Sequence, residues 1–122
     1  MPHVVLRGDI SLADFHAGFE PFAGEHNGVI LKVTDAFLHH EGTIVLLEAL
    51  VVDRRPKGFL VLLDRRGDQT TVRLYPRTDP EKCDGVRRLL AIVAERLLRT
   101  SPGAEVGVTN LSGFFSEGEA PW

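Results

Sequence analysis

Two acidic residues interrupt apolar, strand-like runs and are the candidates for catalysis. Asp35 lies in the run GVILKVTDAFLH, residues 28–39, and Glu48 lies in the run TIVLLEALVV, residues 43–52. A carboxyl group enclosed by apolar side chains can act as a general acid or base. Asp35 could instead sit at a bulge or a sheet edge, or pair with an arginine. The sequence therefore predicts a catalytic Asp35, with Glu48 as a second candidate, only if the fold encloses them.

The pairing of these two runs decides which residues face each other. The stretch HEG, residues 40–42, predicts a three-residue turn with its glycine in the left-handed conformation. Asp35 then lies opposite Leu47, and Glu48 can form a cross-strand pair with Lys32. A register shifted by one residue would instead place Asp35 opposite Glu48 and bring two carboxylates together.

Basic residues form a second candidate site, for a small anion. The triplet Asp-Arg-Arg occurs at 53–55 and again at 64–66. In a meander, the two triplets lie at opposite ends of the strand 59–63, which spans about 17 Å. We interpret the second triplet as a turn without a function. The first shares its end of the sheet with the start of a predicted helix, whose N-terminus favours an anion. The predicted anion-binding residues, named here the anion corner, are Arg54, Arg55, Lys57, Arg77 and Lys82.

Nearby acids can neutralise the anion corner. The alternative interpretation is therefore a solvent-exposed rim whose basic and acidic side chains pair with each other.

The sequence gives little support for a metal site, a cofactor site or a nucleophilic cysteine. His39 and His40 are adjacent, so a strand would point them to opposite faces, and we predict no metal site. The chain has no Walker loop, dinucleotide fingerprint, HExxH or CxxC motif, and we predict no cofactor. Cys83 is expected to be a small buried hydrophobe rather than a nucleophile.

The elements that position these residues follow from apolar periodicity and turn residues. Ser11 and Asp79 are the expected N-caps of two helices, and glycine-containing turns separate four strand-like runs. One domain is expected from 122 residues. The predicted strands are 3–8, 28–39, 43–52, 59–63, 69–75 and 104–110, the predicted helices are 11–20 and 80–100, and the tail 116–122 is expected to fray.

This order, β-α-β-β-β-β-α-β, predicts an α+β fold with a mostly antiparallel sheet. Removing one hairpin leaves βαββαβ, so a ferredoxin-like fold with an extra hairpin is the first expectation. The alternative is a helix-grip-like arrangement, in which a curved sheet wraps over the long C-terminal helix.

Both faces of the predicted meander are largely apolar. An antiparallel sheet with one face in water should be polar on that face, and one long helix can cover only one side. We therefore predict a homodimer that buries the second sheet face. The alternative is a sheet that curls into a partial barrel and covers itself.

Composition narrows the classes of function. A net charge of −3 argues against nucleic-acid binding, and no apolar run approaches the length of a membrane span. We expect no signal peptide, and the single cysteine fits a reducing, cytoplasmic location. The scarcity of Asn, Gln, Met and Cys is one feature of thermophile proteins.

The leading hypothesis for function is a small dimeric module that binds a small or anionic ligand or a protein partner. The alternatives are a cofactor-independent enzyme using Asp35 and a weak RNA or single-stranded nucleic-acid binder.

Overall fold

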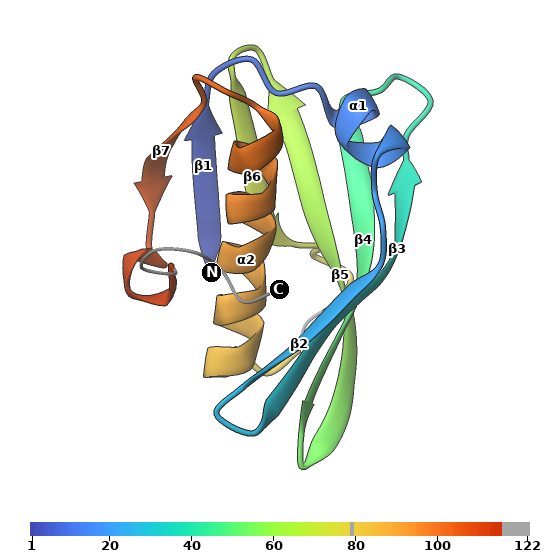
Figure 1. The fold of residues 1–122 in the computed structure, drawn as a ribbon, viewed down its shortest axis with the longest axis vertical. Helices are drawn as coiled ribbons and strands as arrows, with labels where there is room; N and C mark the ends of the chain where they lie inside the picture. The colour runs from blue at the N-terminus through green and yellow to red at the C-terminus, as the bar shows by residue number, and fades with distance from the viewer. Residues whose placement is uncertain (79, 116–122) are drawn as a thin grey trace.

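The computed structural model describes residues 1–78 and 80–115, and Figure 1 shows its fold. The predicted N-cap Asp79 and the tail 116–122 lie outside the described residues. The helices are α1 (Leu12–Ala17) and α2 (Asp84–Thr100), followed by a 3-10 turn, η1 (Ser112–Phe114). The strands are β1 (His3–Arg7), β2 (Phe22–His26), β3 (Val29–Leu38), β4 (Ile44–Asp53), β5 (Arg55–Arg66), β6 (Gln69–Leu74) and β7 (Glu105–Thr109).

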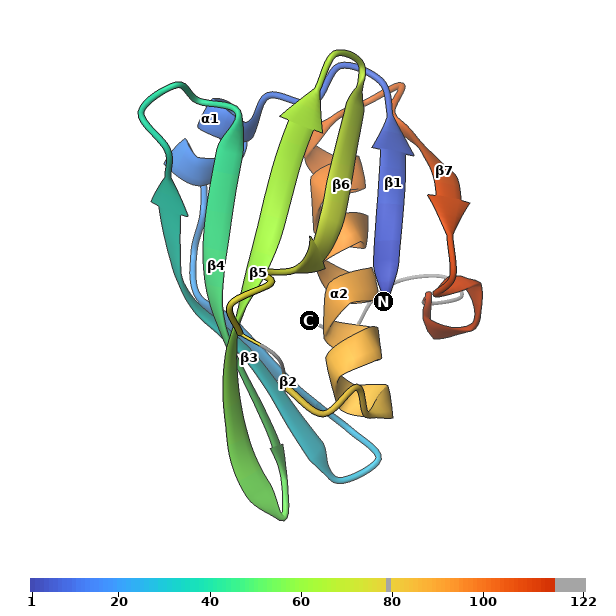
Figure 2. The same cartoon turned by 180° about the vertical axis from the view of Figure 1, so that it is seen from behind.

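The described strands form one sheet in the order β2-β3-β4-β5-β6-β1-β7. Each neighbouring pair is antiparallel, which confirms an α+β fold dominated by an antiparallel sheet. The ferredoxin-like plan is not confirmed. In its split βαβ units one strand lies between the strands before and after each helix, whereas here four strands separate β1 from β2 on either side of α1. The sheet curls, and both helices lie on its inner side, facing the viewer in Figure 1. Figure 2 looks onto the outer side.

Strand β2 is an element that the sequence prediction missed. The segment after the first helix was expected to be a loop, yet Phe22–His26 pairs along its length with β3. Asn27 and Gly28 connect the two strands with φ values of 52° and 81°. Two consecutive positive φ angles are the geometry of a type I′ hairpin turn, for which Asn-Gly is the preferred pair. The dipeptide was therefore the sequence feature that could have identified β2.

Both helices are shorter than expected. Ser11 caps α1 as predicted, because its Oγ accepts a hydrogen bond from the backbone N–H of Asp14 at 3.1 Å. Helix α2 begins at Asp84 rather than at residue 80, with Cys83 at its N-cap position. One stripe of α2 faces the inner side of the sheet and supplies much of the core. Its fully buried residues include Val86, Leu89, Leu90, Val93 and Leu97.

Thr70 on β6 places a polar atom in this apolar interior. The residue has no exposed surface, and its Oγ1 has no hydrogen-bond partner among the described residues. An unpaired buried hydroxyl costs free energy, whereas a methyl group of the same shape does not. We expect Thr70→Val to raise the free energy of unfolding by about 1 kcal/mol in chemical denaturation. The neighbouring Thr71→Val, on the outer face, should change it little, and a destabilised Thr70→Val would contradict the assignment.

Candidate functional site

A β-bulge at Thr34 sets the environment of Asp35 and Glu48. Val33 pairs with Ala49, which is the expected register, but Asp35 pairs with Glu48. The predicted register is therefore wrong from Asp35 to the end of the hairpin. The turn has four residues, 40–43, between the hydrogen-bonded residues His39 and Ile44, instead of the three expected. The bulge absorbs this additional residue and restores the expected pairing further along the strands.

Asp35 and Glu48 are neighbours on the sheet, but both are exposed. An Asp35 carboxylate oxygen accepts the backbone N–H of Ala36 at 2.8 Å, and Glu48 Oε1 accepts the Thr34 hydroxyl at 3.0 Å. Lys32 lies opposite Leu50, as the predicted register has it, but within the described chain it forms no ion pair with Glu48. Enclosure was the condition for a catalytic carboxyl, and the surroundings of Asp35 do not supply it.

Lys57 of the anion corner lies beside an acid. Its Nζ is 3.4 Å from Glu81 Oε2 and 3.9 Å from Cys83 Sγ. Burial acts to lower the pKa of Lys57, but the hydrogen bond to Glu81 and the charges of Cys83, Glu81 and Asp53 raise it above its ordinary value. Lys57 is therefore already paired within the protein.

The other members of the anion corner are distributed over several segments. Arg54 and Arg55 form the exposed tip of the β4–β5 hairpin, where Arg54 has a φ of 65°. Arg77 is exposed in the segment after β6. Lys82 lines a hollow of about 450 Å³ together with Arg87, and none of the other four corner residues lines it. The structure does not gather these five residues around one hollow, and anion binding there stays a prediction.

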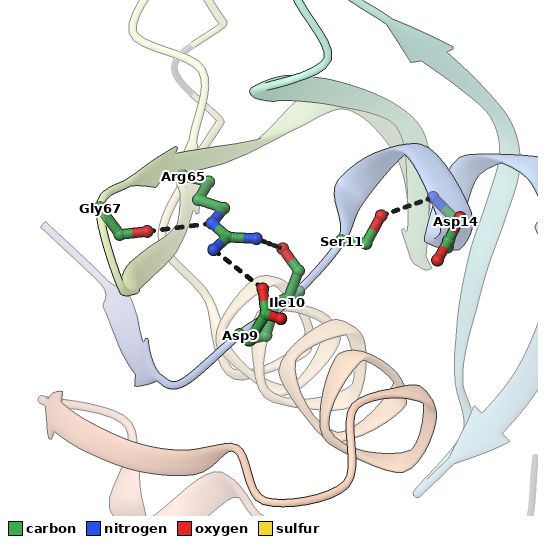
Figure 3. A network of polar contacts seen from close by, with 6 residues as sticks. All are labelled: Asp9, Ile10, Ser11, Asp14, Arg65 and Gly67. Carbon is green, nitrogen blue, oxygen red and sulfur yellow. Dashed lines mark hydrogen bonds and ion pairs between the residues drawn. The ribbon is translucent and has the colours of Figure 1, made fainter.

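The second Asp-Arg-Arg triplet has a structural role that the sequence did not indicate. Arg65 Nη2 lies 2.9 Å from Asp9 Oδ1, and Nη1 donates to the carbonyl of Ile10 at 2.6 Å. Its Nε donates to the carbonyl of Gly67 at 3.0 Å, completing the network in Figure 3. These contacts tie the β1–α1 connection to the β5–β6 turn. The partners are 55 residues apart, so no local pattern announces the contact.

Replacing Arg65 tests this network against the other arginine of the same triplet. Arg65→Met should lower the free energy of unfolding by about 2 kcal/mol, because two backbone carbonyls lose a charged donor. Arg66→Met is the matched control: Arg66 is 84% exposed and pairs only with Asp64 among the described residues. Such a surface pair is worth no more than about 1 kcal/mol. Equal losses for the two variants in urea denaturation would contradict the role of Arg65.

The outer face of the sheet carries apolar side chains with charged ones between them, and it is the candidate interaction site. Phe37 lies opposite Leu46, and Leu46 lies opposite Leu62, so one apolar row crosses β3, β4 and β5. Alternation along each strand places further apolar side chains on this face. We name the set the outer apolar face; its members are Val5, Ile30, Phe37, Ile44, Leu46, Leu50, Val52, Leu60 and Leu62.

The outer apolar face has both a protrusion and a hollow. The side chain of Phe37 is 51% exposed. Gly58 lies opposite Leu50, and a Cβ atom added to it would meet nothing within 4 Å. The missing side chain opens onto a hollow of about 370 Å³, whose lining includes Thr34, Leu50 and Leu60. The hollow could accept an apolar side chain from outside the chain.

Comparisons with protein-family models, with curated proteins and with solved structures find no match for this chain. In the part of the chain that the structure describes, no helix has the length and apolar character needed to cross a membrane. Nor do residues 1–78 and 80–115 contain a group of three or more His, Cys, Asp or Glu side chains placed to hold a metal ion.

Proposed function

We propose that this protein is a self-associating module and that two copies pack through the outer apolar face. The supporting observation is the apolar row Phe37–Leu46–Leu62 on the side of the sheet opposite both helices. Phe37 is exposed and Leu46 is partly exposed, whereas Leu62 is already buried in the single chain. A sheet face in water is normally polar, because successive residues of an antiparallel strand alternate between an apolar inner face and a polar outer face. A contiguous apolar patch on a soluble domain marks an interaction site.

The charges on this face favour a second copy over a strongly charged partner. Lys32, Arg66 and Arg73 lie on the face together with Asp35, Glu48 and Asp64. Because cations and acids are mixed on this surface, it has no dominant charge. Cations of one copy can therefore meet acids of the other, whereas a face of one sign would repel its own copy.

The shape of the outer apolar face also favours a second copy of the chain as the partner. In a twofold dimer, any contact between a residue i and a residue j is made twice. Phe37 protrudes and Gly58 opens a hollow on the same surface. One face therefore carries both the knob and the hole that an isologous contact requires.

The size of the face is close to that of a stable interface. Strands β3 and β4 each have ten residues, and β5 has twelve. At about 3.3 Å per residue and about 4.8 Å between strands, the face covers about 600 to 700 Å² once β6 and β1 are added. A standard interface buries about 800 Å² on each partner.

We further infer a helix-grip-like architecture, in which the curled sheet holds α2 on its inner side. Its support is the position of β1 beside β6, the last strand of the meander, with α2 packed against β1, β3, β4 and β6. Strand β7 extends this plan beyond β1. In such an arrangement the outer face is the large sheet surface left for a partner.

The mass of the native chain in solution tests the proposal. Multi-angle light scattering after size-exclusion chromatography should give twice the 13.5 kDa of one chain at micromolar concentrations. The mass should fall toward that of one chain on dilution, as mass action requires for a reversible dimer. A single-chain mass across the whole concentration range would contradict self-association.

A further inference from the structure

A pocket of about 250 Å³ lies between α1, the start of β2 and the C-terminal half of α2, on the side of the sheet opposite the outer apolar face. Phe15 and Phe19 pack with their ring centroids 6.4 Å apart and line one wall with Phe22. Arg96 and Arg99, one helical turn apart on α2, line the pocket as well. The pocket therefore combines an aromatic wall with two guanidinium groups.

The two arginines share the pocket with the exposed acids Asp14 and Glu20, but they are not ion-paired with them. Among residues 1–78 and 80–115, neither Arg96 nor Arg99 forms an ion pair within 4.0 Å. The guanidinium of Arg96 stacks on Phe22 instead, with its Cζ 3.6 Å from the ring centroid. Burial, and then the charge of Arg99, lower the pKa of Arg96. A positive pair of this kind favours an anion between its members.

Arg96 also leaves a hydrogen-bond donor unused. Its Nε is buried and has no hydrogen-bond partner among the described residues. A buried donor without a partner costs free energy, and a movement of the side chain that brings it to an acceptor would recover that free energy. An arginine side chain suits a carboxylate, because its planar fork can donate two parallel hydrogen bonds.

We propose that this pocket binds a small monocarboxylate with an aromatic body, its carboxylate on Arg96 and Arg99 and its ring on the phenylalanine wall. The volume is below that of most drug-sized sites and suits a molecule of about ten non-hydrogen atoms. Asp14 and Glu20 also line the pocket and are exposed. They would repel a second negative charge, which selects a monocarboxylate over a dicarboxylate. This proposal does not depend on self-association.

Phenylacetate is the probe, and calorimetric titration of the full-length chain is the measurement. We expect saturable binding, with affinity at least about tenfold weaker for phenylacetamide, which has the same shape without the charge, and for the dicarboxylate benzylmalonate. Arg96→Met should weaken phenylacetate binding by about tenfold or more, whereas Arg96→Lys, which keeps the charge without the planar fork, should weaken it less.

Arg88→Met is the matched control, because Arg88 lies on the same helix and also stacks on an aromatic ring, 5.7 Å from that of Phe114, but does not line the pocket. Phenylacetate affinity should be unchanged in this variant. Chemical-shift changes in the wild-type chain at the amides of Phe19, Phe22 and Arg96 provide a test that needs no substitution. The proposal is overturned if phenylacetate does not bind saturably, if phenylacetamide binds equally well, or if the shifts fall elsewhere.

Discussion

Replacing Gly8 with alanine should lower the free energy of unfolding by about 3 kcal/mol, because two separate costs add at this position. Gly8 has a φ of 124°, a conformation that side chains of L-residues rarely adopt. A Cβ atom added there would lie 2.9 Å from the Cα atom of Ala104 and 3.2 Å from its Cβ. The Cα atom belongs to the backbone directly before β7, so relief of the contact requires the backbone at the start of that strand to move. Urea denaturation monitored by circular dichroism measures the loss.

Two other glycines separate the costs. Gly67→Ala has only the conformational cost of a positive φ, since its φ is 62° and a new Cβ would meet nothing within 4 Å. We expect it to lose about 1 kcal/mol. Gly113→Ala has neither a positive φ nor a close contact, so its free energy of unfolding should stay within about 0.5 kcal/mol of the wild-type value. If Gly8→Ala were as stable as Gly113→Ala, the close approach of β1 and β7 would be incorrect.

Phe37→Glu should abolish self-association while leaving the fold intact. Phe37 is half exposed in the single chain, so its loss removes little core packing. In the proposed dimer, the same position is buried, and an unpaired carboxylate there carries a large desolvation cost. We expect the dimer to weaken by about 100-fold or more, measured by sedimentation velocity.

Gly58→Val tests the same interface from the opposite side of the contact. It fills the hollow with a β-branched residue that suits a strand and meets nothing within 4 Å in the single chain. The variant should fold at least as stably as the wild type and still fail to dimerise. Val108→Glu is the control, because Val108 is 61% exposed on the edge strand β7, five strands from Phe37 on β3, and is not a member of the outer apolar face. A dimer that survives Phe37→Glu but dissociates in Val108→Glu would move the interface to that edge.

Local sequence features predicted the parts of the fold that local chemistry determines. The apolar stripe Val86–Leu97 identified the buried side of α2, and the glycine turns identified the meander. Both signals depend on residues close together in the chain. The order of the sheet depends on the pairing of β1 with β6, about 65 residues away. No turn or periodicity encodes that contact, so the ferredoxin-like plan was as compatible with the sequence as the curled sheet.

In the candidate site, too, local sequence features predicted some features and missed others. The apolar second face was visible in the alternation of the strand residues, and Gly42 does adopt the left-handed conformation, with a φ of 79°. One additional turn residue nevertheless moved Asp35 opposite Glu48, because strand register amplifies small differences in loop length. The pocket of Arg96 and Phe22 joins a helix to a strand that the sequence prediction had missed.

Fluorescence of a tryptophan at position 37 tests most directly whether the outer apolar face is buried by self-association. The chain has a single tryptophan, Trp122, so Phe37→Trp combined with Trp122→Phe gives one reporter on the face. We predict blue-shifted emission at concentrations where the dimer forms, and a red shift on dilution with the same midpoint as the fall in mass. Emission typical of an exposed indole that stays unchanged while the chain is dimeric would contradict the proposed interface.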